Sequence, residues 1–257
     1  MLFISPPFGN YINLPDTISI TGSFTLYPRP GLLSQILKTL RYSTEHDGWV
    51  NKIGLRNKGI DFAIQNYKKT DIVSIAILEE HEIDVINSKI PKDMNLEINV
   101  SCPNIDKNLI NLNIKKFINP NRSWCIIKIS PNENIETIDR YYQDGFRQFH
   151  CSNTYKLPSG EGGLSGPFLV PYTNNLITSI KTKYPDTTVI GGGGIRDIEI
   201  ANGYLQRGAD HISVSSLCFN PLLFAAFYYK NKSLILSSLS SLISPLVSRT
   251  HLRIILI

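Results

Sequence analysis

The chain has 257 residues, of which 42% are hydrophobic, 18% charged and 10% aromatic. This composition excludes disordered, fibrous and collagen-like proteins, and the length is typical of one large α/β domain over residues 1–257. Lysine and arginine exceed aspartate and glutamate by 26 − 21 = 5, yet no five like charges occur in a row. The charge therefore does not predict nucleic-acid binding, and it suits anionic small molecules and phosphate-bearing cofactors.

The cysteines and the N-terminus bear on cellular location. Four cysteines are far apart and form no C-x-x-C pair, so neither a metal site nor a disulfide framework is predicted, and a reducing compartment fits best. The N-terminus has no targeting segment, and no stretch reaches the roughly 18 apolar residues of a membrane span. The apolar residues 233–247 are expected to form a packed terminal helix. We therefore expect a cytoplasmic protein that does not bind membranes.

Short β-type segments recur along the whole chain. Helix-length segments separate the later ones, for example Ile198, Ala201 and Tyr204 at helical spacing with Gly208 as the stop. Residues 124–129 form a near-continuous apolar run, which is typical of a strand covered on both faces. The alternation predicts an α/β fold, a (β/α)8 TIM barrel. The eight predicted strands are residues 2–5, 18–21, 72–78, 96–101, 124–129, 147–151, 188–191 and 211–215.

The first quarter departs from this regular pattern. Twelve residues separate Ser5 from Ile18, which is too short for a helical crossover, and residues 28–54 show little periodicity. We therefore expect a barrel whose N-terminal quarter is shortened and irregular.

The segment Glu97-Ile-Asn-Val-Ser-Cys-Pro-Asn104 carries the most chemical information. Barrel enzymes place their chemistry at the carboxyl ends of strands, and Pro103 ends this strand, so Cys102 is expected on a loop. A cation or a flavin nearby would shift its thiol toward a usable general base. A buried, inert cysteine is the commoner case, and we expect it for Cys125 and Cys218.

Lys128 and several asparagines also lie at expected strand ends. Lys128 interrupts an apolar strand, and a charge there needs an anion unless the side chain reaches the barrel rim. Amide groups offer a donor beside an acceptor, which matches the edge of a pyrimidine or imide ring. The chain has 22 asparagines, so a single one means little. The amides of interest are Asn51, Asn99, Asn104 and Asn153.

Four consecutive glycines, Gly191 to Gly194, end one predicted strand and precede a helix. Bare backbone N–H groups there could bind a phosphate, and the hydroxyls of Ser215 and Ser216 end the following strand. Strands seven and eight supply a phosphate site in many TIM barrels. A glycine-rich turn that only allows close packing is the alternative, and the pattern is not a G-x-G-x-x-G fingerprint.

In combination, these motifs resemble the flavin-dependent dihydroorotate dehydrogenases. The resemblance implies a (β/α)8 barrel with FMN at its C-terminal mouth, and the oxidation of dihydroorotate to orotate in pyrimidine biosynthesis. Homodimers are common in that family, so a homodimer is also an expectation. The strings that carry the resemblance, in the family's order, are Gly22–Thr25, Pro28–Gly31, Asn51–Leu55, Asn99–Asn104, Lys128, Ser152–Thr154, Gly162–Gly166, Gly191–Gly194 and Ser215–Ser216.

The resemblance also implies a role for each matched residue. Cys102 resembles the base that removes the C5 proton while hydride leaves C6, and Lys128 resembles the cation that stabilises reduced flavin. A cysteine base is similar to the soluble branch of the family, which implies a soluble, non-quinone electron acceptor. The implied substrate contacts are Asn51, Gly54, Leu55, Asn99, Asn104, Asn153 and Thr154. The implied FMN contacts are Gly22, Ser23, Asn99, Lys128, Ser152, Ser165, Gly166, Gly193, Gly194, Ser215 and Ser216.

One departure from the family leaves alternatives open. Members of the family usually present a lysine from the first or second strand, but residues 7–10 and 21–23 contain none. Lys52, Arg56 or Arg29 would then supply the cation for the orotate carboxylate. A flavin-dependent reductase of a neutral pyrimidine, such as uracil or a uridine in RNA, needs no such cation. A third reading is a non-catalytic flavin- or phosphate-binding barrel.

Overall fold

The computed structural model describes residues 1–100 and 113–232. The chain forms two compact units, residues 1–216 and residues 217–257, so a single domain over the whole chain stays a prediction. In the second unit, residues 221–232 are helical. Within the described ranges, no helix is both long and apolar enough to cross a membrane. The predicted helix over residues 233–247 lies outside the described residues.

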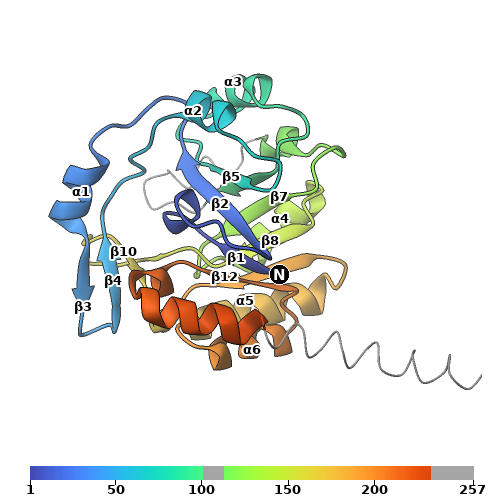
Figure 1. Cartoon of the computed structure of the whole chain (residues 1–257). Helices are drawn as coiled ribbons and strands as arrows, with labels where there is room; N and C mark the ends of the chain where they lie inside the picture. Colours follow the sequence, from blue (N-terminus) through green and yellow to red (C-terminus); the bar gives the residue numbers. More distant parts are fainter. Residues whose placement is uncertain (101–112, 233–257) are drawn as a thin grey trace, which may run out of the picture. The chain divides into compact units, whose positions relative to one another are not determined.

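Eight parallel strands close into a barrel, which confirms the predicted TIM-barrel fold (Figure 1). Each predicted strand is present, with ends that differ by a few residues. Going round the barrel the order is β1-β12-β11-β8-β7-β6-β5-β2. The strands are β1 (Leu2–Ile4), β2 (Thr17–Phe24), β5 (Ile72–Ile75), β6 (Leu96–Asn99), β7 (Cys125–Ile129), β8 (Gln148–Cys151), β11 (Thr188–Gly192) and β12 (His211–Val214).

Helices connect the strands of the later barrel, and polar caps fix where two of them begin. Asn134 accepts a hydrogen bond from the backbone of Thr137 at the start of α4, and Asp197 does the same for Ile200 at the start of α6. Gly208, with φ +103°, follows α6 as predicted. The helices are α3 (Glu82–Lys89), α4 (Ile135–Gln143), α5 (Val170–Lys183) and α6 (Ile198–Gln206), with 3₁₀ turns η3 (Ile114–Phe117), η4 (Pro167–Leu169) and η5 (Ser216–Phe219).

The N-terminal quarter is irregular, as expected. Only a 3₁₀ turn, η1 (Phe8–Asn10), joins the parallel neighbours β1 and β2. The connection is tight, because a Cβ placed on Gly9 would lie 2.0 Å from the carbonyl oxygen of Ile20. Between β2 and β5 the chain leaves the barrel to form α1 (Leu32–Thr39), β3 (Arg41–Ser43), β4 (Gly48–Asn51) and α2 (Ile60–Gln65).

A second, antiparallel sheet lies to one side of the barrel strands (Figure 1). Its order is β3-β4-β10-β9, where β9 is Tyr155–Lys156 and β10 is Gly163–Ser165. Val50, Leu157 and Leu164 form its own small core. Sequence analysis did not predict this sheet, because its strands are two to four residues long and come from two separate barrel connections.

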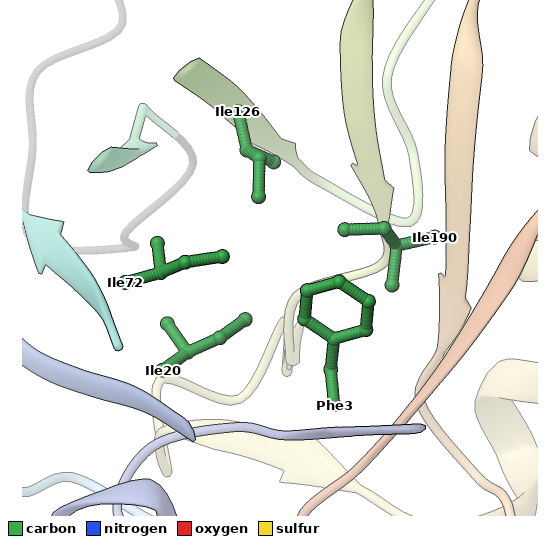
Figure 2. Close-up of a cluster of buried hydrophobic side chains, with 5 residues drawn as sticks. All are labelled: Phe3, Ile20, Ile72, Ile126 and Ile190. Atoms are coloured by element: carbon green, nitrogen blue, oxygen red, sulfur yellow. The ribbon is translucent and has the colours of Figure 1, made fainter. Parts of the chain in front are cut away.

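The barrel interior is apolar at one level and polar at the next. Five fully buried side chains point toward a common centre from five strands (Figure 2). Strand side chains alternate between faces, so the residue two positions later also points inward. On all five strands that residue is small or polar. The apolar layer is Phe3, Ile20, Ile72, Ile126 and Ile190, and the residues that follow it are Ser5, Gly22, Ser74, Lys128 and Gly192.

Candidate active site

Three ionisable side chains meet inside the barrel on adjacent strands. Lys128 on β7 lies in register with His150 on β8, and Glu97 comes from β6. The Lys128 Nζ atom is 3.7 Å from Glu97 Oε1, and His150 Nδ1 is 2.6 Å from Glu97 Oε2. The three side chains are 9%, 2% and 0% exposed for Lys128, His150 and Glu97 respectively. Glu97 is therefore the anion that a lysine at this position requires.

A directional chain of hydrogen bonds runs from the site residues to this carboxylate. The Ser74 hydroxyl donates to Glu97 Oε1 over 2.8 Å, so the 2.8 Å contact between Ser23 and Ser74 has Ser23 as its donor. The Asn99 amide donates to the Ser23 hydroxyl over 3.0 Å, and the Asn153 amide donates to Asn99 Oδ1 over 2.9 Å. Each hydrogen bond of this series is donated in the direction of Glu97. Three predicted site residues, Ser23, Asn99 and Asn153, are thus brought together.

The charge state of this cluster follows from its surroundings. Burial disfavours the Glu97 carboxylate, but the Lys128 charge and the hydrogen bonds from His150 and Ser74 together hold its pKa below the usual range. Burial, with a smaller contribution from Lys128, lowers the pKa of His150 although Glu97 opposes the shift. The cluster is therefore an ion pair of Glu97 and Lys128 beside a neutral imidazole. Because a carboxylate only accepts, the imidazole Nδ1–H is the donor.

A glycine cradle lies where the sequence predicts a phosphate site. Gly193 and Gly194 have φ of +84° and +79°, a region that favours glycine. A Cβ on Gly194 would lie 2.7 Å from the Gly166 carbonyl oxygen, and one on Gly193 would lie 3.3 Å from Ser152 Oγ. Among the described residues, no acceptor binds the backbone N–H groups of Gly193 and Gly194. Such groups can bind an anion such as a phosphate.

The serines of the predicted cofactor site already have partners in the fold. Ser215 donates its hydroxyl to the Pro6 carbonyl oxygen over 2.9 Å, so this side chain can accept from a ligand but not donate to it. Ser152 shares a 2.9 Å hydrogen bond with Thr173. Ser165 ends β10 beside Gly166, and Ser216 begins η5 directly after Ser215.

The second sheet carries several of the predicted substrate residues. Asn51 on β4 is the register partner of Gly163 on β10. Thr154 lies against the same glycine, because a Cβ on Gly163 would come 2.6 Å from Thr154 Oγ1. A side chain at Gly163 would collide with Thr154. Asn51 on β4 and Thr154 directly before β9 therefore lie beside β10, the strand between β4 and β9.

The loop with Gly54 and Leu55 is attached to the end of β2. The Arg29 side chain donates to the Gly54 carbonyl oxygen over 3.3 Å. Asn57 donates to the Leu55 carbonyl oxygen over 2.7 Å and to the Thr25 hydroxyl over 2.9 Å. The two other candidate cations also bind backbone carbonyls at 3.3 Å, Lys52 that of Gly160 and Arg56 that of Pro30.

Sequence reasoning missed four residues of this site and could not be tested on two others. Glu97 and His150 were given no role, because only the closed barrel makes their strands the two neighbours of the strand that carries Lys128. Ser74 and Asn57 carry no signal in a chain rich in serine and asparagine. Cys102 and Asn104 lie outside the described residues. Cys125 and Cys218 fit the inert role expected of them, because burial raises the pKa of each thiol to about 12.

The lowered pKa of His150 predicts acid sensitivity. Below a pH of about 6.5 the unfolded chain binds a proton at this residue that the folded chain does not, so the free energy of unfolding falls as pH falls. Replacing His150→Asn keeps a donor near Glu97 but removes the titration. Urea unfolding at pH 5 to 7 is expected to show a slope smaller by up to about 1.4 kcal/mol per pH unit. The exposed His81→Asn variant is the control, and equal slopes for all three proteins would contradict the assignment.

Known proteins of similar sequence are described as dihydroorotate dehydrogenases. The family model for dihydroorotate dehydrogenase matches residues 10–226. The chain is 28% identical to the catalytic subunit of dihydroorotate dehydrogenase B (NAD(+)) from Thermotoga petrophila, covering 85% of this chain and 93% of the relative. It is 30% identical to the protein of the same description from Petrotoga mobilis, over 72% of each chain.

Fold similarity points in the same direction. A crystal structure of dihydroorotate dehydrogenase from Eimeria tenella, in complex with ferulenol, superposes with a TM-score of 0.64. The sequences are 18% identical, and the match covers 86% of this chain and 76% of the other, so this likeness concerns the fold alone. The family model spans well over half of the chain. The chain therefore belongs to the dihydroorotate dehydrogenase family, whose members are oxidoreductases that act on CH–CH bonds.

Proposed function

We propose that this protein uses FMN to oxidise dihydroorotate to orotate. The observation that carries the proposal is the convergence of two sets of groups at the carboxyl ends of the barrel strands. One set is the cation Lys128 with the amides of Asn99 and Asn153, and the other is the glycine cradle of Gly193 and Gly194. Family membership makes dihydroorotate the substrate of choice for such a site.

The described residues fit FMN in shape and in chemistry. The cradle leaves no space for a Cβ at Gly194, and its backbone N–H groups suit a phosphate. Lys128, at the polar level of the barrel, would face the ring system and stabilise negative charge there. When bound, FMN supplies an acceptor for the hydride that leaves C6 of the substrate. Residues Gly22, Ser23, Ser152, Ser165, Gly166, Ser215 and Ser216 complete the proposed cofactor contacts.

The chain's own groups then divide the remaining work. Cys102 is proposed to take the C5 proton of dihydroorotate at its sulfur, acting as a general base. The amides of Asn51, Asn99, Asn104 and Asn153 are proposed to orient the ring through donor and acceptor pairs. Gly54, Leu55 and Thr154 line the substrate from the second sheet and its loop.

Anaerobic reduction tests cofactor, substrate and catalysis together. The purified protein should absorb visible light as bound FMN does, and dihydroorotate should bleach that absorbance without oxygen. Bleaching by dihydrouracil alone would instead support a reductase of neutral pyrimidines. A coloured protein that neither compound bleaches would be a non-catalytic flavin protein, and a colourless one that FMN does not restore would contradict the proposal.

Replacing Cys102→Ser separates proton removal from cofactor binding. We expect the variant to retain FMN but to be reduced by dihydroorotate at least about a hundredfold more slowly, because a thiol can ionise near neutral pH to a thiolate that accepts the proton, whereas a serine hydroxyl cannot. Stopped-flow absorbance measures the rate. The Cys125→Ser variant, at a partly buried thiol of strand β7, is the control, and an unchanged rate for Cys102→Ser would rule out Cys102 as the base.

The glycine cradle predicts a position-specific loss of FMN. In Gly194→Ala the added Cβ would lie 2.7 Å from the Gly166 carbonyl oxygen, so the cradle must distort. We expect the dissociation constant for FMN to rise by at least about tenfold. Gly160→Ala is a matched control, because Gly160 also has a positive φ, +74°, but no described atom lies within 4 Å of its Cβ position. Equal FMN affinity in the two variants would contradict the cradle assignment.

The relatives suggest which acceptor to test. Several are described as catalytic subunits of an NAD(+)-type enzyme, so we propose that electrons pass to NAD+ through a second, soluble protein subunit rather than to a membrane quinone. Steady-state assays with NAD+, fumarate and a quinone, with and without the subunit of the relatives, decide this. If a quinone were the only acceptor that supported turnover, the proposed soluble acceptor would be refuted. The proposed homodimer is tested separately by sedimentation of the purified chain.

A further inference from the structure

We propose that Glu97 and His150 are positioning residues for Lys128: the carboxylate fixes the ammonium group at the polar level of the barrel and keeps it charged, and the imidazole fixes the carboxylate. The inference rests on the proposed function, because it takes FMN as the group that Lys128 serves. Neither Glu97 nor His150 is needed for the steps assigned above, yet both are completely or almost completely buried.

The geometry gives each of the two residues a distinct task. Glu97 uses one oxygen for Lys128 and the Ser74 hydroxyl, and the other for His150 Nδ1. Both oxygens are therefore held, one by groups on β5 and β7 and the other by a group on β8. A carboxylate fixed in this way offers Lys128 a single ion-pair geometry. Because the carboxylate cannot move, the position of the ammonium group is fixed as well.

Burial makes the carboxylate necessary for the charge as well as for the position. An ammonium group with almost no exposure to water is stable only beside an anion, and removal of that anion favours the neutral amine. His150 cannot replace the anion, and if it were protonated it would compete with Lys128 for Glu97. The imidazole is thus suited to orient Glu97 without sharing its charge.

The chain also contains a matched interior control. Ser213 on β12 shares a 2.6 Å hydrogen bond with Ser5 and is 2% exposed. Like Glu97 it is a buried polar residue of the barrel interior, but no hydrogen bond or ion pair among the described residues joins it to Lys128. Replacing Ser213→Ala therefore tests the general effect of disturbing the barrel.

The first experiment measures FMN affinity of the apoprotein at pH 7 and pH 9. Relative to wild type, Glu97→Gln should weaken binding by about tenfold or more at pH 9 and by less at pH 7, because the Lys128 amine loses its proton more readily as pH rises when the Glu97 carboxylate is no longer beside it. His150→Leu should also weaken FMN binding. His150→Asn should bind FMN as wild type does, because the asparagine amide can donate to Glu97 in place of Nδ1. Ser213→Ala should behave as wild type. If the FMN affinity of Glu97→Gln depended on pH in the same way as that of Ser213→Ala, the proposal would be overturned.

A second experiment needs no cofactor. The side-chain carbon signal of Lys128 in isotope-labelled apoprotein, identified by its loss in Lys128→Met, reports the protonation of the amine. We expect its titration midpoint to lie at least about two pH units lower in Glu97→Gln than in wild type, which is the shift that a tenfold loss of binding at pH 9 requires. An unchanged midpoint would overturn the inference even if FMN binds. A wild type that binds no FMN would defeat the proposed function, while this titration would still decide the role of Glu97.

Discussion

Lys128 can occupy the interior of the closed barrel because Glu97 lies beside it. Burying a charge without a partner costs several kcal/mol of desolvation free energy, by order of magnitude. Lys128 and Glu97 are therefore buried as a pair. The rest of the polar cluster follows from this requirement. His150 and Ser74 satisfy the carboxylate, Ser23 satisfies Ser74, and the amide of Asn99 satisfies Ser23. Residues from five of the eight strands or the loops after them are thereby joined into one network around a single carboxylate.

The two-residue period of the strands determines where that network can lie. The apolar layer of Phe3, Ile20, Ile72, Ile126 and Ile190 fills the barrel and excludes water from one side of the ion pair (Figure 2). Two positions later the inward residues become small or polar, which leaves space at the carboxyl ends of the strands. The barrel thus has an apolar level that stabilises the fold and, next to it, a polar level that carries the Glu97–Lys128 ion pair. This division agrees with the placement of active sites throughout the TIM-barrel class.

The barrel could be predicted from the sequence because each strand carries its own local signal. The second sheet could not, because β3 and β9 are three and two residues long and acquire meaning only through their partners. The same distinction holds in the site. Lys128 stands out as a charge in an apolar run, and Gly193 and Gly194 as consecutive glycines after a strand. Glu97 and His150 lie on β6 and β8, on either side of the strand that carries Lys128, but their roles depend on which strands become neighbours, and that is a property of the closed barrel. Asn57 shows the limit, since one asparagine among 22 cannot be distinguished by composition.

The charge balance of the interior bears on how an anionic substrate would be held. With His150 neutral, Glu97 and Lys128 cancel, so the described interior offers no net positive charge to a carboxylate. Under the proposed function the attraction must then come from outside the barrel, and the candidate cations Lys52, Arg56 and Arg29 all belong to the excursion that builds the second sheet. The barrel would hold the cofactor, and the excursion would hold the substrate. Under the proposed function, the irregular connection between β2 and β5 would serve as a substrate platform as well as a crossover between the two strands.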